Sequence, residues 1–165
     1  MAITKINGGV TAPKGFLASG LNAGIKNQTK KDMAMVFSST PCAAAGVFTT
    51  NLVKAAPVKW DKEIVTTSPY VQAVVVNSGI ANACTGAEGL GYCADTAAEA
   101  AAALNIPKTA VLVASTGVIG KQLPIDKIKS GVTALSKVIG SSREDAKLAA
   151  EAIMTTDTKS KEVAC

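Results

Sequence analysis

Short apolar runs separated by glycine, proline, asparagine and lysine make up the first half of the chain. Apolar runs of this length that end at turn residues are typical of buried strands. The pattern predicts strands at Met33 to Phe37, Ala45 to Thr50, Ala55 to Trp60 and Val71 to Val76, with a weakly alternating edge strand between Leu17 and Lys26. Tight turns between successive strands favour an antiparallel or mixed sheet.

Helical patterns follow in the second half. Tyr92 to Leu104 is rich in alanine and stops just before a proline, which predicts a helix packed closely on a sheet. Pro124 to Ile139 carries one apolar face at helical spacing. Ser141 and Glu144 fit a capping box that opens a further helix ending near Met154. The chain is therefore predicted to be α/β, with a layered mixed sheet packed against helices.

Two of the strands run directly into turns of hydroxyl residues and glycine. Val111 to Gly120 reads VLVASTGVIG, and Val71 to Val76 is followed by Asn77-Ser78-Gly79. Consecutive backbone N–H groups in such turns bind anions or a developing oxyanion. Two such turns indicate a shared cleft, with two unrelated turns as the alternative. A third hydroxyl cluster, Thr155 to Thr158, follows the last predicted helix, where Asp157 could simply hold the turn.

Length and composition indicate one folded domain. The chain has 165 residues, of which 48% are hydrophobic and 18% charged, and this composition excludes a disordered chain. No apolar run approaches the roughly 18 residues that span a bilayer. Glycines and a proline interrupt the N-terminal stretch where a signal peptide needs an unbroken apolar segment. We therefore expect a cytoplasmic protein.

The net charge of +5 comes almost entirely from lysine, because Arg143 is the only arginine. Aromatic residues are just 4%, whereas base reading favours arginine and single-strand binding favours aromatic platforms. We expect a solvated basic surface and neither a nucleic-acid nor a membrane partner. The four cysteines, Cys42, Cys84, Cys93 and Cys165, show no C-x-x-C spacing, so we interpret them as reduced and mostly buried thiols.

Histidine is absent from the sequence. This absence excludes a Ser-His-Asp or Cys-His nucleophilic pair within the chain, and with it a histidine-containing zinc site. Acyl chemistry here would need another base: a lysine, a carboxylate or the free amine of an N-terminal nucleophile.

Five motifs, in order along the chain, resemble those of the ornithine acetyltransferase (glutamate N-acetyltransferase) family of arginine biosynthesis. The resemblance covers essentially the whole chain, and the common order makes it specific although each motif alone is weak. The motifs are GGVTAPKGF (8–16), AAGVFTTN (44–51), VVVNSG followed by ANACTG (74–86), ASTGVIG (114–120) and IMTTDT (153–158).

The resemblance implies a precursor that cleaves itself before a threonine, giving an α chain and a β chain. The new N-terminal threonine of the β chain would be the nucleophile and its amine the base. It would take acetyl from N2-acetyl-L-ornithine and pass it to L-glutamate, with acetyl-CoA as a second donor in some members. No cofactor or metal is implied. The expected assembly is an αβ heterodimer that pairs into α2β2.

By the same resemblance, the oxyanion-hole pair falls on Thr116 and Gly117, and a substrate-binding threonine falls on Thr155. Ile80 departs from the family, which usually has a second asparagine there. The family's binding lysine and cleavage threonine would lie beyond Cys165. We therefore expect residues 1–165 to be a single α-chain domain that is incomplete at its C-terminus, where Val163 to Cys165 begins a strand, and inactive alone.

Two other functions compete with this one. Gly117 to Lys121 reads GVIGK, close to a phosphate-binding loop, but the spacing to the first glycine is wrong and Gln122 stands where serine or threonine is needed. The second alternative is a non-catalytic homologue or fragment that acts as an interaction or structural subunit.

Overall fold

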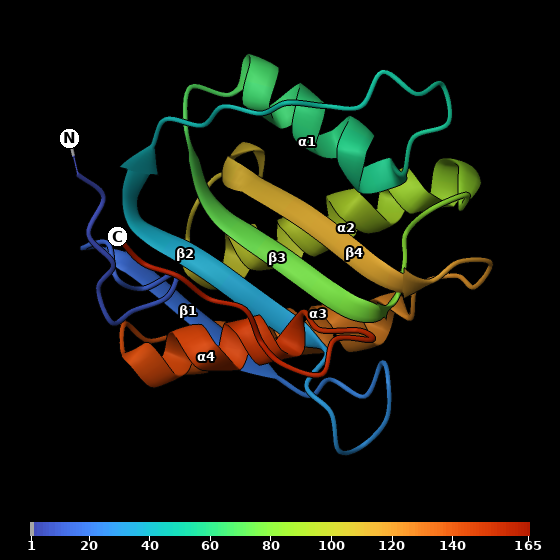
Figure 1. Ribbon diagram of the computed structural model, residues 1–165. Helices are drawn as coiled ribbons and strands as arrows, with labels where there is room; N and C mark the ends of the chain where they lie inside the picture. The colour runs from blue at the N-terminus through green and yellow to red at the C-terminus, as the bar shows by residue number, and fades with distance from the viewer. Residues whose placement is uncertain (1) are drawn as a thin grey trace.

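The computed structural model describes residues 2–165, and within them a four-stranded sheet forms the centre of the molecule (Figure 1). The strands lie in chain order, β1-β2-β3-β4. The first three pair antiparallel, and β3 and β4 pair parallel, so the predicted mixed sheet is confirmed. The strands are β1 (Phe16–Leu21), β2 (Met33–Cys42), β3 (Val71–Ile80) and β4 (Val111–Val118).

One face of the sheet forms the main core. Side chains at alternate positions of a strand point to the same face, and here they meet the helices α2 (Gly86–Leu104) and α3 (Ile125–Val138). Alanines along α2 let its backbone approach the sheet closely. The buried strand residues on this face are Met33, Met35, Ala73, Val75, Val111 and Val113.

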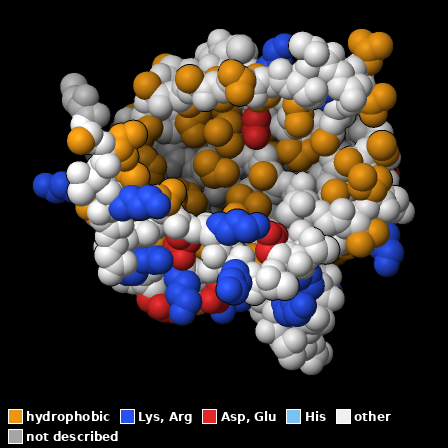
Figure 2. Space-filling view, viewed as in Figure 1, with side chains coloured by type: hydrophobic (Ala, Val, Ile, Leu, Met, Phe, Trp, Pro, Cys, Tyr) orange, Lys and Arg blue, Asp and Glu red, His pale blue; other side chains and the backbone are white. Residues whose placement is uncertain are grey.

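The opposite face is only partly covered. Helix α4 (Arg143–Ala152) packs across β1 and β2 through small residues, including Ala18, Ala34 and Ala149. The contact is tight enough that a Cβ on Gly20 would lie 2.1 Å from the Leu148 carbonyl oxygen. Beyond α4 the face is open, and Figure 2 shows a hollow lined by hydrophobic side chains there. Its half-buried sheet residues include Val74, Val76, Leu112 and Ala114.

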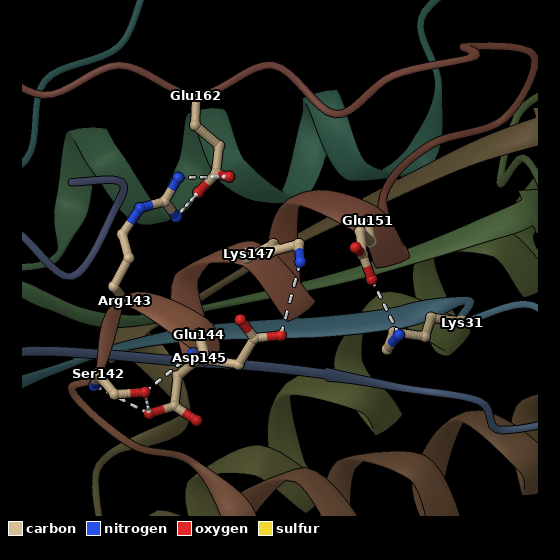
Figure 3. A network of polar contacts seen from close by, with 8 residues as sticks. All are labelled: Lys31, Ser142, Arg143, Glu144, Asp145, Lys147, Glu151 and Glu162. Atoms are coloured by element: carbon tan, nitrogen blue, oxygen red, sulfur yellow. Dashed lines mark hydrogen bonds and ion pairs between the residues drawn. The ribbon is translucent and has the colours of Figure 1, made fainter. Parts of the chain in front are cut away.

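Polar contacts at its start hold α4 in place (Figure 3). At its start the Ser142 hydroxyl accepts a hydrogen bond from the Asp145 N–H while the Asp145 carboxylate accepts from the Ser142 N–H, which forms a capping box. The predicted pair, Ser141 and Glu144, was wrong by one residue because the backbone turns helical only at Arg143. Arg143 binds Glu162 and ties the C-terminal segment to the helix.

Helix α1 (Ala56–Thr67) corrects the predicted strand from Ala55 to Trp60. Pro57 lies in its first turn, where proline's missing N–H costs nothing, and the helix packs on β4 and α2. The predicted strand from Ala45 to Thr50 was also wrong: it has no regular structure, and Val47 is fully exposed. Its strand-like composition finds no neighbouring strand edge among residues 2–165, and strand propensity depends on such partners.

Smaller differences concern the ends of elements and the thiols. Helix α2 begins at Gly86, six residues before the predicted Tyr92. The strand expected to begin at Val163 is represented only by a single bridge between Ala164 and Ile6. All four cysteines are free, but only Cys93 is buried, so the expectation of mostly buried thiols was wrong. Burial raises the pKa of Cys93 to about 12, which leaves its thiol unreactive. None of the helices in residues 2–165 could span a membrane.

Helix α1 closes part of the outer edge of β4. The Trp60 indole N–H donates to the Val111 carbonyl at 3.1 Å, and an Asp61 carboxylate oxygen accepts from the Val113 N–H at 3.0 Å. These side chains satisfy edge groups that another strand could otherwise pair with. Burial raises the pKa of Asp61 to about 6, although the hydrogen bond from Val113 opposes the shift.

Replacing Asp61 with Asn should stabilise the chain in a pH-dependent way. Because folding raises the pKa of Asp61, the ionised carboxylate opposes folding. The protonated carboxyl contributes its full share to the stability of the fold below the unfolded pKa of 3.8, and this contribution is lost as pH rises through the folded pKa of about 6. Asn keeps an acceptor for Val113 without the charge. We expect a gain of about 1 kcal/mol at pH 8, after allowance for solvent screening, and none at pH 4.

Urea unfolding at the two pH values measures this difference. Glu63→Gln, on the exposed side of the same helix, should change the unfolding free energy by less than about 0.5 kcal/mol. An Asp61→Asn gain that is the same at pH 4 and pH 8 would contradict the burial of a charged carboxylate.

Candidate functional site

A cleft of about 510 Å³ lies at the C-terminal ends of β3 and β4. It is bounded by the loop between β1 and β2 and by the segment that follows α4. The structure therefore brings together the two strand-end turns and the threonine cluster near the C-terminus. Thr116, Gly117 and Thr155 all line this one cleft. The lining residues are Lys26, Asn27, Lys30, Gly79, Thr116, Gly117, Val118, Thr155 and Thr156.

The parallel register of β3 and β4 aligns the two turns residue by residue. Ser78 is opposite Thr116, and Gly79 is opposite Gly117. Because parallel strands end at the same edge of a sheet, both turns open on the same side. The Ser115 hydroxyl donates to the Asn77 side-chain oxygen at 2.6 Å and joins the strands just before the cleft.

Glycine is required where the turns meet. Gly117 has φ +133°, and a Cβ there would lie 2.3 Å from the carbonyl carbon and oxygen of Gly79. Gly79 has φ +108°, and its Cβ would lie 2.7 Å from the Lys26 side chain. At both positions glycine lets a neighbouring group come close, and it adopts a backbone conformation that other residues rarely adopt.

Thr116 and Gly117 present two neighbouring donors. Thr116 lies on the open face of the sheet, is exposed, and its hydroxyl has no hydrogen-bond partner within residues 2–165. Strand alternation directs the Gly117 N–H to the outer edge of β4, as it does the Val113 N–H. Adjacent N–H and O–H donors of this kind can stabilise an oxyanion.

Ser78 connects the sheet to the segment that carries Thr155. It is fully buried, its hydroxyl donates to the Ala152 carbonyl at the end of α4, and its N–H donates to the Asp32 carbonyl at 2.8 Å. These bonds fix where α4 ends relative to β3. The chain then turns so that Thr155 and Thr156 face the cleft.

The loop between β1 and β2 supplies the cleft's charge. Fully buried Asp32 shapes it by accepting hydrogen bonds from the N–H groups of Ala23 at 2.7 Å, Ile25 at 2.6 Å and Lys26 at 3.0 Å. Lys26 and Lys30 line the cleft and no carboxylate does, which favours an anionic ligand. Sequence reasoning read this stretch only as a lysine-rich turn. The signal that could have identified Asp32 is an acidic residue placed directly before the apolar run that forms β2.

The GVIGK stretch bears on the phosphate-binding alternative. Gly120 and Lys121 do not line the cleft, and no helix begins until Ile125, so the GVIGK stretch lacks the helix start that a phosphate-binding loop needs.

Ile80, the departure from the family motif, is half-buried against the main core, and its carbonyl accepts from the Asn77 amide at 2.9 Å. Within residues 2–165 no three His, Cys, Asp or Glu side chains gather as metal ligands would.

The chain belongs to the ArgJ family, whose model matches residues 17–165. It is 51% identical over 150 residues to the arginine biosynthesis bifunctional protein ArgJ of Thermotoga neapolitana, covering 90% of this chain and 37% of the relative. The corresponding protein of Symbiobacterium thermophilum is 53% identical over 159 residues, covering 95% and 39%. The chain thus spans about two fifths of the length of these relatives.

Two solved structures share the fold. Ornithine acetyltransferase from Mycobacterium tuberculosis, complexed with ornithine, superposes with a TM-score of 0.89 at 45% identity and covers 94% of this chain and 85% of that one. The ArgJ protein of Bacillus halodurans also gives 0.89, at 42% identity, covering 94% and 81%. The ornithine acetyltransferase-like fold predicted from the sequence is confirmed.

Gly117→Ala should destabilise the chain more than Gly120→Ala. Both positions have positive φ, so both substitutions strain the backbone, but only at position 117 would the new Cβ meet the backbone of β3. We expect a loss of about 1 kcal/mol at Gly120 and about 3 kcal/mol at Gly117. Urea unfolding of the two variants checks this, and equal losses would contradict the close approach of β3 and β4.

Proposed function

We propose that this chain is the α-chain part of an acyltransferase that moves acetyl from N2-acetyl-L-ornithine to L-glutamate through an acetyl-threonine intermediate. The observation that carries the proposal is that the two candidate oxyanion donors and Thr155 line one basic cleft in a member of the ArgJ family. Substrates of this reaction carry carboxylates, which suit the lysines of the cleft.

The proposed chemistry begins with a threonine outside these residues. Its hydroxyl attacks the acetyl carbonyl of N-acetylornithine while its own amine takes the proton. The carbonyl oxygen becomes an oxyanion, to which the Thr116 hydroxyl and the Gly117 N–H donate. Collapse of the tetrahedral intermediate breaks the C–N bond, and ornithine leaves with the proton. The amine of glutamate then attacks the acetyl-threonine ester and the ester C–O bond breaks. The proton lost by this amine passes through the threonine amine to the threonine oxygen, which gives N-acetylglutamate and restores the threonine.

In this reaction Thr116 and Gly117 act on charge that exists only in the transition state and the intermediate. Thr155 and Lys30, which also lines the cleft, act on the bound substrate. The two groups of residues should therefore differ kinetically: the donors chiefly affect kcat, and the binding residues chiefly affect KM.

The assembly is part of the proposal. The open apolar face beside α4 has a hollow of about 390 Å³ lined by residues such as Val36, Val76 and Val163, and we assign it to contact with the β chain. The working unit would be an αβ heterodimer pairing into α2β2, placed in the cytoplasm. No cofactor takes part, and acetyl-CoA is a second acetyl donor. Residues 1–165 alone would lack the nucleophile and be inactive.

Replacing Thr116 with Ala in the complete enzyme should lower kcat by about a hundred- to a thousandfold, the usual cost of one oxyanion donor. KM for N-acetylornithine should change much less, because the hydroxyl acts chiefly after the oxyanion forms. Steady-state kinetics with thermal unfolding measures both, and Thr116→Ser, which keeps the hydroxyl, is the matched control. A loss of less than tenfold, or one explained by unfolding, would leave Thr116 as a turn residue and favour a non-catalytic role for this cleft.

A further inference from the structure

Lys26 makes the direct contact between the two sides of the cleft. It leaves the β1–β2 loop, crosses Gly79, and its ammonium donates to the carbonyl of Met154, the residue immediately before Thr155. The same ammonium donates to the Lys31 carbonyl at 3.1 Å. Two of its three N–H groups are therefore engaged, and one of the acceptors belongs to the segment that lines the cleft opposite Thr116.

Several hydrogen bonds and one ion pair hold the β1–β2 loop against the sheet and α4. Three backbone N–H groups converge on the buried Asp32 carboxylate, and the Asp32 carbonyl accepts from the Ser78 N–H at 2.8 Å in β3. Lys31 adds an ion pair at 2.9 Å with Glu151, near the end of α4 (Figure 3). The start of the Lys26 side chain is thus fixed to the sheet, and its tip is fixed to the chain after α4.

The stretch from Met154 to Asp157, which Lys26 holds, has few other contacts. Met154 follows the last turn of α4, and its N–H donates to the Glu151 carbonyl at 3.3 Å, while Thr155 and Thr156 are exposed. Asp157 binds Lys161, four residues on, a contact within the segment itself. The bond from Lys26 to Met154 is consequently the tie that joins this segment directly to the opposite loop of the cleft.

We propose that Lys26 is a positioning residue, which holds the Met154 carbonyl so that Thr155 faces the wall formed by Thr116 and Gly117. This inference rests on the proposed function, in which Thr155 binds substrate. Gly79 is glycine partly for this reason, because a Cβ at that position would lie 2.7 Å from the Lys26 side chain. Lys26 acts through the backbone before Thr155 and does not take part in the chemistry.

The test is steady-state kinetics of Lys26→Met in the complete enzyme, with Thr155→Val measured alongside. Methionine keeps the apolar stem across Gly79 and removes the donors. A hydrogen bond from a charged group contributes enough for its loss to raise KM for N-acetylornithine about tenfold or more, with kcat changed less than about threefold. Lys26→Arg retains charged donors and should recover part of the KM.

Lys127→Met is the matched control. Lys127 also donates to a carbonyl of the same loop, that of Gly24 at 2.6 Å, but it lies on α3 and does not line the cleft. The substitution removes one positive charge and one lysine-to-carbonyl bond, and KM should change less than about twofold. Thermal unfolding of each variant separates loss of positioning from loss of fold.

A double-mutant cycle links Lys26 to Thr155. If Lys26 acts by placing Thr155, the variant with both Lys26→Met and Thr155→Val should have nearly the KM of Thr155→Val alone. Additive effects, an unchanged KM in Lys26→Met, or equal effects of Lys26→Met and Lys127→Met would each overturn the inference while leaving the Thr116 result intact. Failure of the proposed function shows separately, as an unchanged kcat in Thr116→Ala.

Discussion

The parallel pairing of β3 with β4, in register at two glycines, is the constraint on which the rest of the cleft depends. A Cβ on Gly117 would overlap the backbone of Gly79, so the two strands can approach to their observed distance only with glycine at that place. This approach sets Ser78 beside Thr116 and leaves the Thr116 hydroxyl on the open face. The position of the candidate oxyanion donors is therefore a property of the sheet.

The other side of the cleft is built outward from the same two strands. Ser78 binds the end of α4 and the backbone of Asp32, so one buried residue fixes both the helix and the β1–β2 loop. Asp32 then shapes the loop, and Lys26 reaches from it to the Met154 carbonyl. The Met154 carbonyl, directly before Thr155, is thus bound by a lysine 128 residues away in sequence. Preorganised donors and binding groups of this kind need no rearrangement when charge develops.

Sequence patterns identified what depends on local chemistry. The apolar runs of β2, β3 and β4 and the apolar face of α3 were recognised because burial on one or both faces leaves a regular signature. The run from Ala55 to Trp60 was misread as a strand, because α1 shows only a short apolar stretch and is held by packing and by the Trp60 and Asp61 bonds to β4. The unpaired run from Ala45 to Thr50 shows that strand composition without a partner does not make a strand.

Some residues of the site could likewise be identified from the sequence, and others could not. The hydroxyl-and-glycine turns were visible because they follow strongly apolar strands, and the family resemblance named Thr116, Gly117 and Thr155. Lys26 and Asp32 were missed, because their importance comes from contacts to Met154 and to backbone N–H groups that no spacing reveals. Long-range polar contacts of this kind leave little periodic trace in a sequence.

The central claim is that Thr116 and Gly117 stabilise a tetrahedral oxyanion. The most direct measurement is the inhibition constant of a tetrahedral mimic, N-acetylornithine with a methylphosphonyl group in place of acetyl, across Thr116→Ser, Thr116→Val and Thr116→Ala in the complete enzyme. The account predicts that its logarithm follows log(KM/kcat) with a slope near one and does not follow log KM, because a transition-state mimic loses the same bond as the transition state. An inhibition constant unchanged across the three variants while kcat falls, or one that follows KM alone, would contradict it.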